Sequence, residues 1–178
     1  SNPDIVKRLP TYHAIILAKN NTGRVNLYKL ISESHLTYYA KRPRIPKSLL
    51  LAHREGLILG SACEAGELYR ALLDDRSDAD IARIVNFYDY LEIQPTGNNK
   101  FMINEEKIRN INSIEDIQDV NKRIVALGEQ YNKPVVATCD VHFLDPGDEV
   151  YRRIIMAGKG FKDSDEQAPL YLRTTEEM

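Results

Sequence analysis

The stretch KPVVATCDVHFLDP, residues 133–146, begins as an apolar run and ends in side chains that bind metal ions. Its small and β-branched residues are typical of a buried strand. Asp140 and His142 follow that run two positions apart, and a carboxylate beside an imidazole is a combination that metal sites use. Such pairs also arise by chance, so the decision depends on whether further ligands come from other parts of the chain.

Outward from this stretch, segments typical of strands and helices alternate. Four apolar runs are suited to strands: residues 11–18, 56–62, 90–95 and 133–141. Six segments favour helices: residues 20–36, 46–55, 65–75, 77–90, 113–132 and 148–158. This alternation predicts an α/β fold around a parallel sheet.

Capping signals mark several of the predicted helix starts. Ser113 with Asp116 three residues later predicts a capping box. Ser77 and residues 20–22 are expected to cap two other helices. In the segment 20–36, apolar residues at helical spacing form one broad stripe: Val25, Leu27, Tyr28, Leu30, Ile31 and Leu36.

Candidate metal ligands lie at or beside the ends of the predicted strands. Cys63 follows the second strand, Asp140 and His142 follow the fourth, and His13 lies early in the first. In parallel α/β folds, side chains from different strands meet at the carboxyl ends of the strands. Imidazole, thiolate and carboxylate are the side chains that bind zinc and related divalent metals. The arrangement predicts one metal site from these four residues.

Each candidate also has a purely structural interpretation. Cys63 could be a buried thiol, His13 a histidine satisfied within the core, and Asp140 a cap for the following loop. The sequence separations match no compact metal-binding loop, so the argument depends on position at strand ends. Cys139 alternates with Asp140 and is expected to face away and pack in the core. The remaining histidines, at positions 35 and 53, have no strand-end position and are assigned structural roles.

Composition limits the function classes. The 178 residues are 43% hydrophobic and 28% charged, with a formal net charge of −2, which leaves no general basic surface for nucleic acid. No apolar run is long enough for a membrane span. Two cysteines without a secretory signal indicate reduced thiols in a cytoplasm. A basic stretch, Lys41, Arg42, Arg44 and Lys47, is assigned to a solvated loop, with contact to a nucleic-acid backbone as the alternative.

Several motifs together resemble a known family. They are TYHAIILAKNNTGRVNLYKLISESHL, RPRIP, EGLILGSACEAGE, FYDYLEIQP, NKPVVATCDVHFLDPGDEVYRRIIMAGKGF and LRTTEEM. In order and spacing they resemble the PHP (polymerase and histidinol phosphatase) domain of bacterial replicative DNA polymerase III α subunits, and most closely the PolC type. The resemblance covers about residues 10–178.

The resemblance implies a fold and a site. The fold would be part of a distorted seven-stranded β/α barrel, with parallel strands, outer helices and a metal cluster at the carboxyl-terminal mouth. His13, Cys63, Asp140 and His142 match four of the nine ligands of that cluster, whereas Glu64 matches none. The implied cofactor is a divalent metal, zinc or manganese, with magnesium for the polymerase of the parent chain.

The sequence also departs from the family pattern. It contains no His-x-His pair, and the other early ligand motifs are absent. Chains of the PolC type carry an exonuclease inserted within the PHP domain, so this chain is expected to be the part after the insertion. Residues 1–9 would then be a linker or a cloning remnant, and residues 10–178 a partial PHP domain that ends before the polymerase region.

The expected role is therefore a structural module with a partial metal site and no turnover of its own. Its expected partners are the remaining PHP, exonuclease and polymerase segments of a cytoplasmic parent chain, and, through that chain, DNA and replisome subunits, without a membrane. Two alternatives remain open. One is a stand-alone PHP-type phosphoesterase resembling histidinol phosphatases, and the other is an interaction domain whose metal residues no longer bind metal.

Overall fold

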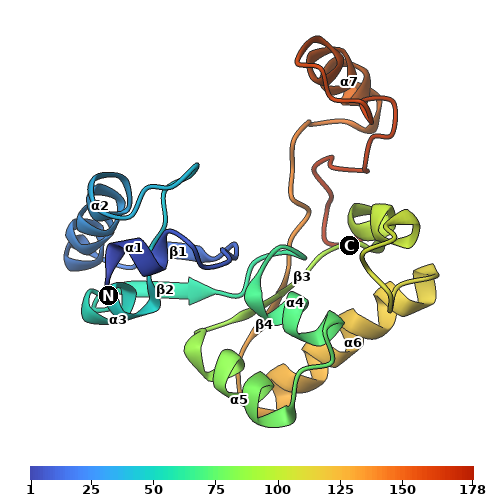
Figure 1. Ribbon diagram of the computed structural model, residues 1–178. Helices are drawn as coiled ribbons and strands as arrows, with labels where there is room; N and C mark the ends of the chain where they lie inside the picture. The colour runs from blue at the N-terminus through green and yellow to red at the C-terminus, as the bar shows by residue number, and fades with distance from the viewer.

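The computed structural model describes residues 1–178 as a mixed α/β chain (Figure 1). The strands are β1 Ile15–Ala18, β2 Leu57–Gly60, β3 Leu91–Ile93 and β4 Val135–Ala137. The α-helices are α1 Pro3–Val6, α2 Asn21–Leu36, α3 Lys47–Ala52, α4 Glu67–Leu73, α5 Asp78–Phe87, α6 Ile114–Gln130 and α7 Glu149–Gly158. Two 3₁₀ segments, η1 Thr96–Asn104 and η2 Pro146–Asp148, complete the order. All four predicted strands are present, although each is shorter than the apolar run that predicted it.

The strands form two pairs joined by one bridge. β1 runs antiparallel to β2, with Ile15 opposite Gly60. β3 runs parallel to β4, with Leu91 opposite Val135. A parallel bridge between Gly60 and Tyr90 places β2 beside the start of β3. β2, β3 and β4 therefore run in one direction, with the end of β2 beside the start of β3.

The prediction of parallel strands is confirmed for β3 and β4 and is wrong for β1. The alternation of strand and helix patterns does not encode direction, which depends on the connection between strands. The connection from β1 to β2 holds α2, α3 and the proline-containing segment 40–46 instead of one crossover helix. That longer path returns the chain antiparallel to β1.

The hydrophobic core lies between the strands and the helices α4, α5 and α6 (Figure 1). Its fully buried members include Leu59 of β2, Leu68 of α4, Ile84 of α5, Leu91 of β3 and Ile117 of α6. Burial of side chains of this size stabilises the fold by about 1.5–3 kcal/mol each. This core holds the three co-directional strands in place.

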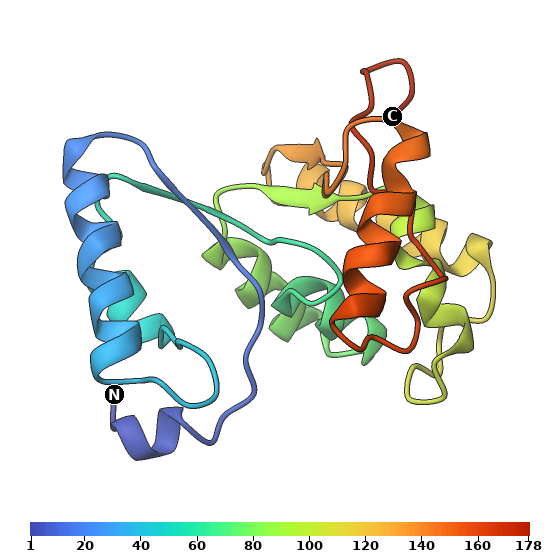
Figure 2. The ribbon, with the colours of Figure 1, turned by 90° about the horizontal axis from the view of Figure 1, so that it is seen from above.

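Helices α2 and α7 lie on opposite sides of the molecule (Figure 2), and α2 joins the core through Leu30, whereas α7 contributes no core residue. The apolar stripe of α2 is only partly covered, because Leu30 is fully buried but Tyr28 is 62% and Leu36 84% exposed. No residue of α7 is buried. Helical spacing of apolar residues predicts a helix, but it does not establish that the surrounding chain covers every apolar position.

Three predicted helix caps are confirmed. Ser113 and Asp116 form a reciprocal capping box at the start of α6. Ser77 accepts a hydrogen bond from the Asp80 amide at the start of α5, and Asn20 accepts one from the Gly23 amide at the start of α2. These bonds satisfy amides that have no partner within the helix. None of the helices combines the length and apolarity that a membrane crossing requires.

The two ends of the chain are locally ordered by polar contacts. Residues 1–9 include α1, and the Arg44 guanidinium donates hydrogen bonds to the carbonyls of Val6 at 3.3 Å and Leu9 at 2.6 Å. At the other end, residues 174–178 form a turn in which the Thr174 amide donates to a Glu177 carboxylate oxygen. The assignment of residues 1–9 as a linker stays a prediction.

Candidate metal centre

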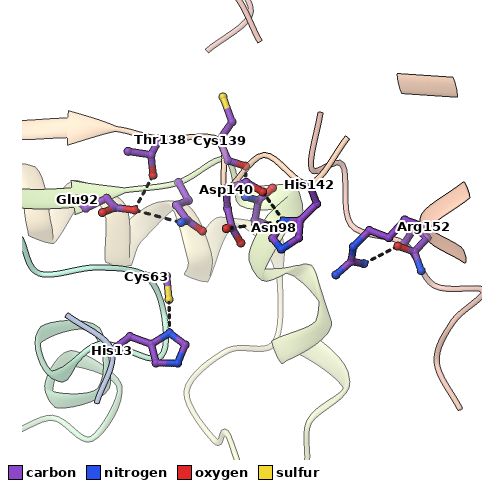
Figure 3. Close-up of polar contacts among 11 residues, drawn as sticks. His13, Cys63, Glu92, Asn98, Thr138, Cys139, Asp140, His142 and Arg152 are labelled. Atoms are coloured by element: carbon purple, nitrogen blue, oxygen red, sulfur yellow. Dashed lines mark hydrogen bonds and ion pairs between the residues drawn. The ribbon is translucent and has the colours of Figure 1, made fainter. Parts of the chain in front are cut away.

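His13 and Cys63 form the first pair of candidate ligands. Cys63 lies in the turn after β2, and His13 lies on the segment before β1, which reaches that turn through a parallel bridge to Gly66. The His13 amide donates to the Ala65 carbonyl at 3.0 Å. These backbone contacts bring the Cys63 Sγ to 3.5 Å from the His13 Nδ1 (Figure 3). The imidazole is exposed and the thiol is half-buried.

The electrostatic surroundings keep the Cys63 thiol protonated in the absence of a metal. Burial raises the pKa of Cys63 to about 11, and the neighbouring Glu64 carboxylate acts in the same direction. A divalent cation favours the thiolate and reverses this effect. The turn is also strained, because Ala62 has a φ of 60°, in the left-handed region that β-carbon-bearing residues avoid.

Asp140 and His142 form the second pair, in the turn after β4. His142 Nδ1 lies 2.8 Å from the Asp140 carbonyl oxygen and 3.8 Å from its carboxylate Oδ1. With Nδ1–H donated to the carbonyl, the lone pair of Nε2 is free to bind a metal, an arrangement common to histidine ligands. The His142 amide donates to the Leu170 carbonyl at 2.8 Å, which fixes the backbone on the other side.

A buried polar network links the two turns. The side chain of Glu92 on β3 is buried, and its Oε1 accepts hydrogen bonds from Thr138 Oγ1 at 2.5 Å and from Gln94 Nε2 at 3.2 Å (Figure 3). The Glu92 amide donates to Ser61 Oγ at 3.0 Å. Ser61 precedes Cys63 by two residues and Thr138 precedes Asp140 by two. Glu92 therefore ties the strand ends that carry the two pairs.

The structure places the four sequence-predicted ligands in two separate pairs and not in the single site predicted, and no group of three or more metal-binding side chains is present. The donor types fit a divalent transition metal, since each pair presents an imidazole with a thiol or a carboxylate. A second sign of fit is the Asn98 Oδ1 atom, beside the Asp140–His142 turn, which is buried without a hydrogen-bond partner. The residues present therefore suit a metal at each pair, and the ligand set stays a prediction.

The other polar residues considered from the sequence have structural contacts. Cys139 points away from Asp140, as predicted, but its Sγ lies 3.1 Å from the Met178 sulfur on the half-exposed surface and not in the core (Figure 3). The Nδ1 atoms of His35 and His53 lie within hydrogen-bonding distance of carbonyls in their own helices. These histidines are occupied within the fold, in agreement with their structural assignment.

Half of the basic stretch at residues 41–47 is also engaged internally. Arg44 holds the amino-terminal segment, as described above. Lys47 forms an ion pair with Glu67 at 2.5 Å and lies 4.8 Å from the centre of the Phe87 ring. Only Lys41 and Arg42 remain without such contacts, which weakens the interpretation of the stretch as a nucleic-acid contact.

Three residues that form hydrogen bonds at or beside the two turns were missed by sequence reasoning: Glu92, Asn98 and Thr138. Glu92 gave a usable signal, because a carboxylate within the apolar run YLEI must find a buried partner. Asn98 lies in a turn-forming TGNN segment and gave none.

Comparisons with known proteins agree with the resemblance stated from the sequence. The family model described as the PHP domain matches residues 4–96, more than half of the chain. The DNA polymerase III PolC-type of Clostridium perfringens is 58% identical over 178 residues, which cover all of this chain and 12% of that protein. The protein of the same name from Bacillus subtilis is 41% identical over 175 residues, 97% of this chain and 12% of that protein.

The Thermotoga petrophila protein of that name is 44% identical over 170 residues, which cover 96% of this chain and 12% of the relative. The chain thus spans about an eighth of the length of these curated relatives. The family match and these relatives confirm the resemblance. The chain belongs to the PHP domain family.

Proposed function

We propose that this chain is the later part of the PHP module of a PolC-type replicative DNA polymerase III, where it supports the fold and supplies four ligands of a polynuclear metal site. The parent chain would be a cytoplasmic DNA-directed DNA polymerase with a 3′–5′ exonuclease. Its remaining PHP, exonuclease and polymerase segments would be the immediate partners of this chain, and DNA and replisome subunits would be partners of the parent. The likeness to relatives of that name over almost the whole chain supports this assignment.

The observation that carries the metal site is the polar network that joins the turns after β2 and β4. Glu92 of β3 accepts a hydrogen bond from Thr138, which precedes one turn, and its amide donates to Ser61, which precedes the other. One turn carries Cys63 and the other carries Asp140 and His142. The closure of these strands into a seven-stranded barrel belongs to the same proposal.

A divalent metal held by such residues supplies a Lewis acid for phosphate oxygens and lowers the pKa of bound water. The residues offer two places for it, one at His13 and Cys63 and one at Asp140 and His142. The chain by itself offers only two side chains at each point, fewer than the three protein ligands usual in a catalytic zinc site. We therefore expect the isolated chain not to hydrolyse phosphoesters, which argues against the stand-alone phosphoesterase.

The test is metal content after equilibrium dialysis against zinc and, separately, manganese, measured by elemental analysis. We expect about one bound metal per wild-type chain. The Cys63→Ala, His142→Ala double variant should lose it. A matched variant, Cys139→Ala with His53→Ala, removes the same residue types away from the candidate turns and should retain the metal.

Equal metal content in the two double variants would overturn the site assignment. Hydrolysis of a simple phosphodiester such as bis(p-nitrophenyl) phosphate by the wild-type chain, lost in the first double variant, would instead favour the stand-alone phosphoesterase. Circular dichroism of each variant establishes that a lost metal does not reflect a lost fold.

A further inference from the structure

Asn98 lies in η1 beside the turn that carries the second pair of candidate ligands. Its side chain is 8% exposed, and its Nδ2 donates a hydrogen bond of 2.9 Å to the Cys139 carbonyl (Figure 3). The Cys139 carbonyl belongs to the peptide unit that enters Asp140. Asn98 therefore holds the backbone at the point where the Asp140 side chain is aimed.

The backbone of this turn needs contacts from other segments to hold its conformation. Asp140 has a φ of 54°, a left-handed conformation that costs an L-residue energy and persists only when neighbouring contacts impose it. The β4 strand ends at Ala137, so the strand ladder does not extend to this turn. The amide of Asn98 and the Leu170 carbonyl, which accepts from the His142 amide, hold the turn from its two sides.

The second polar atom of Asn98, Oδ1, gives an independent observation. Its Oδ1 is buried and accepts no hydrogen bond from any protein group. An unsatisfied buried carbonyl is costly, and its occurrence calls for an unseen donor or ion. Because Nδ2 donates to the Cys139 carbonyl, Oδ1 of the same amide also lies at this turn. It can accept a hydrogen bond from a ligand of the bound metal, such as a water molecule.

We propose that Asn98 is a positioning residue of the metal centre, which holds the Asp140–His142 turn through Nδ2 and faces the bound ion's surroundings through Oδ1. This inference rests on the proposed metal site and adds to it a residue from outside the four-ligand set. Residues that orient metal ligands typically change metal affinity by about 10–100-fold when removed.

The experiment is a titration of the 178-residue chain with Co²⁺, followed by visible absorption, which reports both affinity and ligand geometry. Asn98→Leu removes both polar atoms and keeps the number of side-chain heavy atoms. Its matched control is Asn99→Leu, because Asn99 is also buried and also has an unpartnered Oδ1, but its amide contacts the Tyr69 hydroxyl and not the ligand turn.

We expect Asn98→Leu to bind Co²⁺ about tenfold more weakly or worse, with a changed visible spectrum, and Asn99→Leu to match the wild type in both. Asn98→Ala adds no bulk and should show the same loss of affinity, which tests the role of the amide even if leucine impairs folding. Wild-type binding by Asn98→Leu, or an equal loss in the Asn99 control, would overturn the positioning role and leave the metal site intact. Absence of Co²⁺ binding by the wild type would overturn the metal site itself, and this inference with it.

Discussion

Replacement of Thr138 by valine is expected to lower the free energy of unfolding by about 2 kcal/mol. The hydroxyl of Thr138 donates to the Oε1 of Glu92, whose side chain is 7% exposed. A hydrogen bond to a charged group contributes about 1.5–3 kcal/mol, because its loss leaves the acceptor desolvated and unpaired. Valine has nearly the same volume as threonine, so no cavity adds to this cost. The remaining donor, Gln94 at 3.2 Å, satisfies only part of the carboxylate.

The assay is urea unfolding followed by circular dichroism, supported by thermal unfolding. For a chain of this size, about 2 kcal/mol corresponds to a decrease of about 4–8 °C in the midpoint temperature. Thr138→Ser is the matched control, since it keeps the hydroxyl and should lose less than half as much stability. The same Thr138→Val change in a Glu92→Leu background should be almost neutral, because no buried carboxylate is left unpaired.

Two outcomes would refute the network argument. A Thr138→Val variant within about 0.5 kcal/mol of the wild type, the range of ordinary surface substitutions, would show that the hydroxyl contributes no net stability. An equal loss with and without Glu92 would show that the effect comes from the threonine site alone and not from its bond to the carboxylate.

Three further outcomes are expected. Gly23→Ala should destabilise the chain by about 1–3 kcal/mol in urea unfolding, since its β-carbon would meet the Gly56 carbonyl, whereas Gly158→Ala, with open space around it, should be neutral or stabilising. Burial raises the pKa of Tyr69 to about 12. The contribution of Tyr69 to the free energy of unfolding is therefore complete below pH 10 and is lost as the pH rises from about 10 to 12. In unfolding measured across this pH range, Tyr69→Phe should lose about 2 kcal/mol less stability than the wild type. Alkylation of metal-free Cys63 by iodoacetamide should accelerate about tenfold per pH unit from pH 7 to 10 in peptide-resolved mass spectrometry, and a flat profile would contradict its raised pKa.

The order of elements was predictable because each pattern is local. The capping box of Ser113 and Asp116 and the apolar run that became β4 depend on residues that are neighbours in sequence. The antiparallel direction of β1 and the exposure of Tyr28 on α2 were not predictable in this way. Both depend on how distant segments pack, and a periodic pattern carries no information about the partner that covers it.

The candidate site, too, was predictable only where it depends on local patterns. Strand-end logic placed Cys63 and Asp140 at one edge because parallel neighbours share a direction, and the structure has that direction for β2 and β4. It also placed His13 in one site with Cys63, but their approach to 3.5 Å depends on a bridge from a segment outside the strands. The positioning residue Asn98 was missed because its only contact with the turn is a side-chain bond across 41 positions of sequence.

The hydrogen bond between Glu92 and Thr138 also bears on which side chains reach the site. β4 contains only three residues, so its ladder with β3 supplies few bonds to define the register. A slip by one residue would turn Cys139 toward the site and Asp140 away from it, because successive side chains of a strand face opposite sides. Such a slip would also separate the Thr138 hydroxyl from the buried carboxylate of Glu92. The loss of stability expected for Thr138→Val is therefore also a measure of how strongly the chain selects an aspartate, and not a cysteine, as the ligand from this turn.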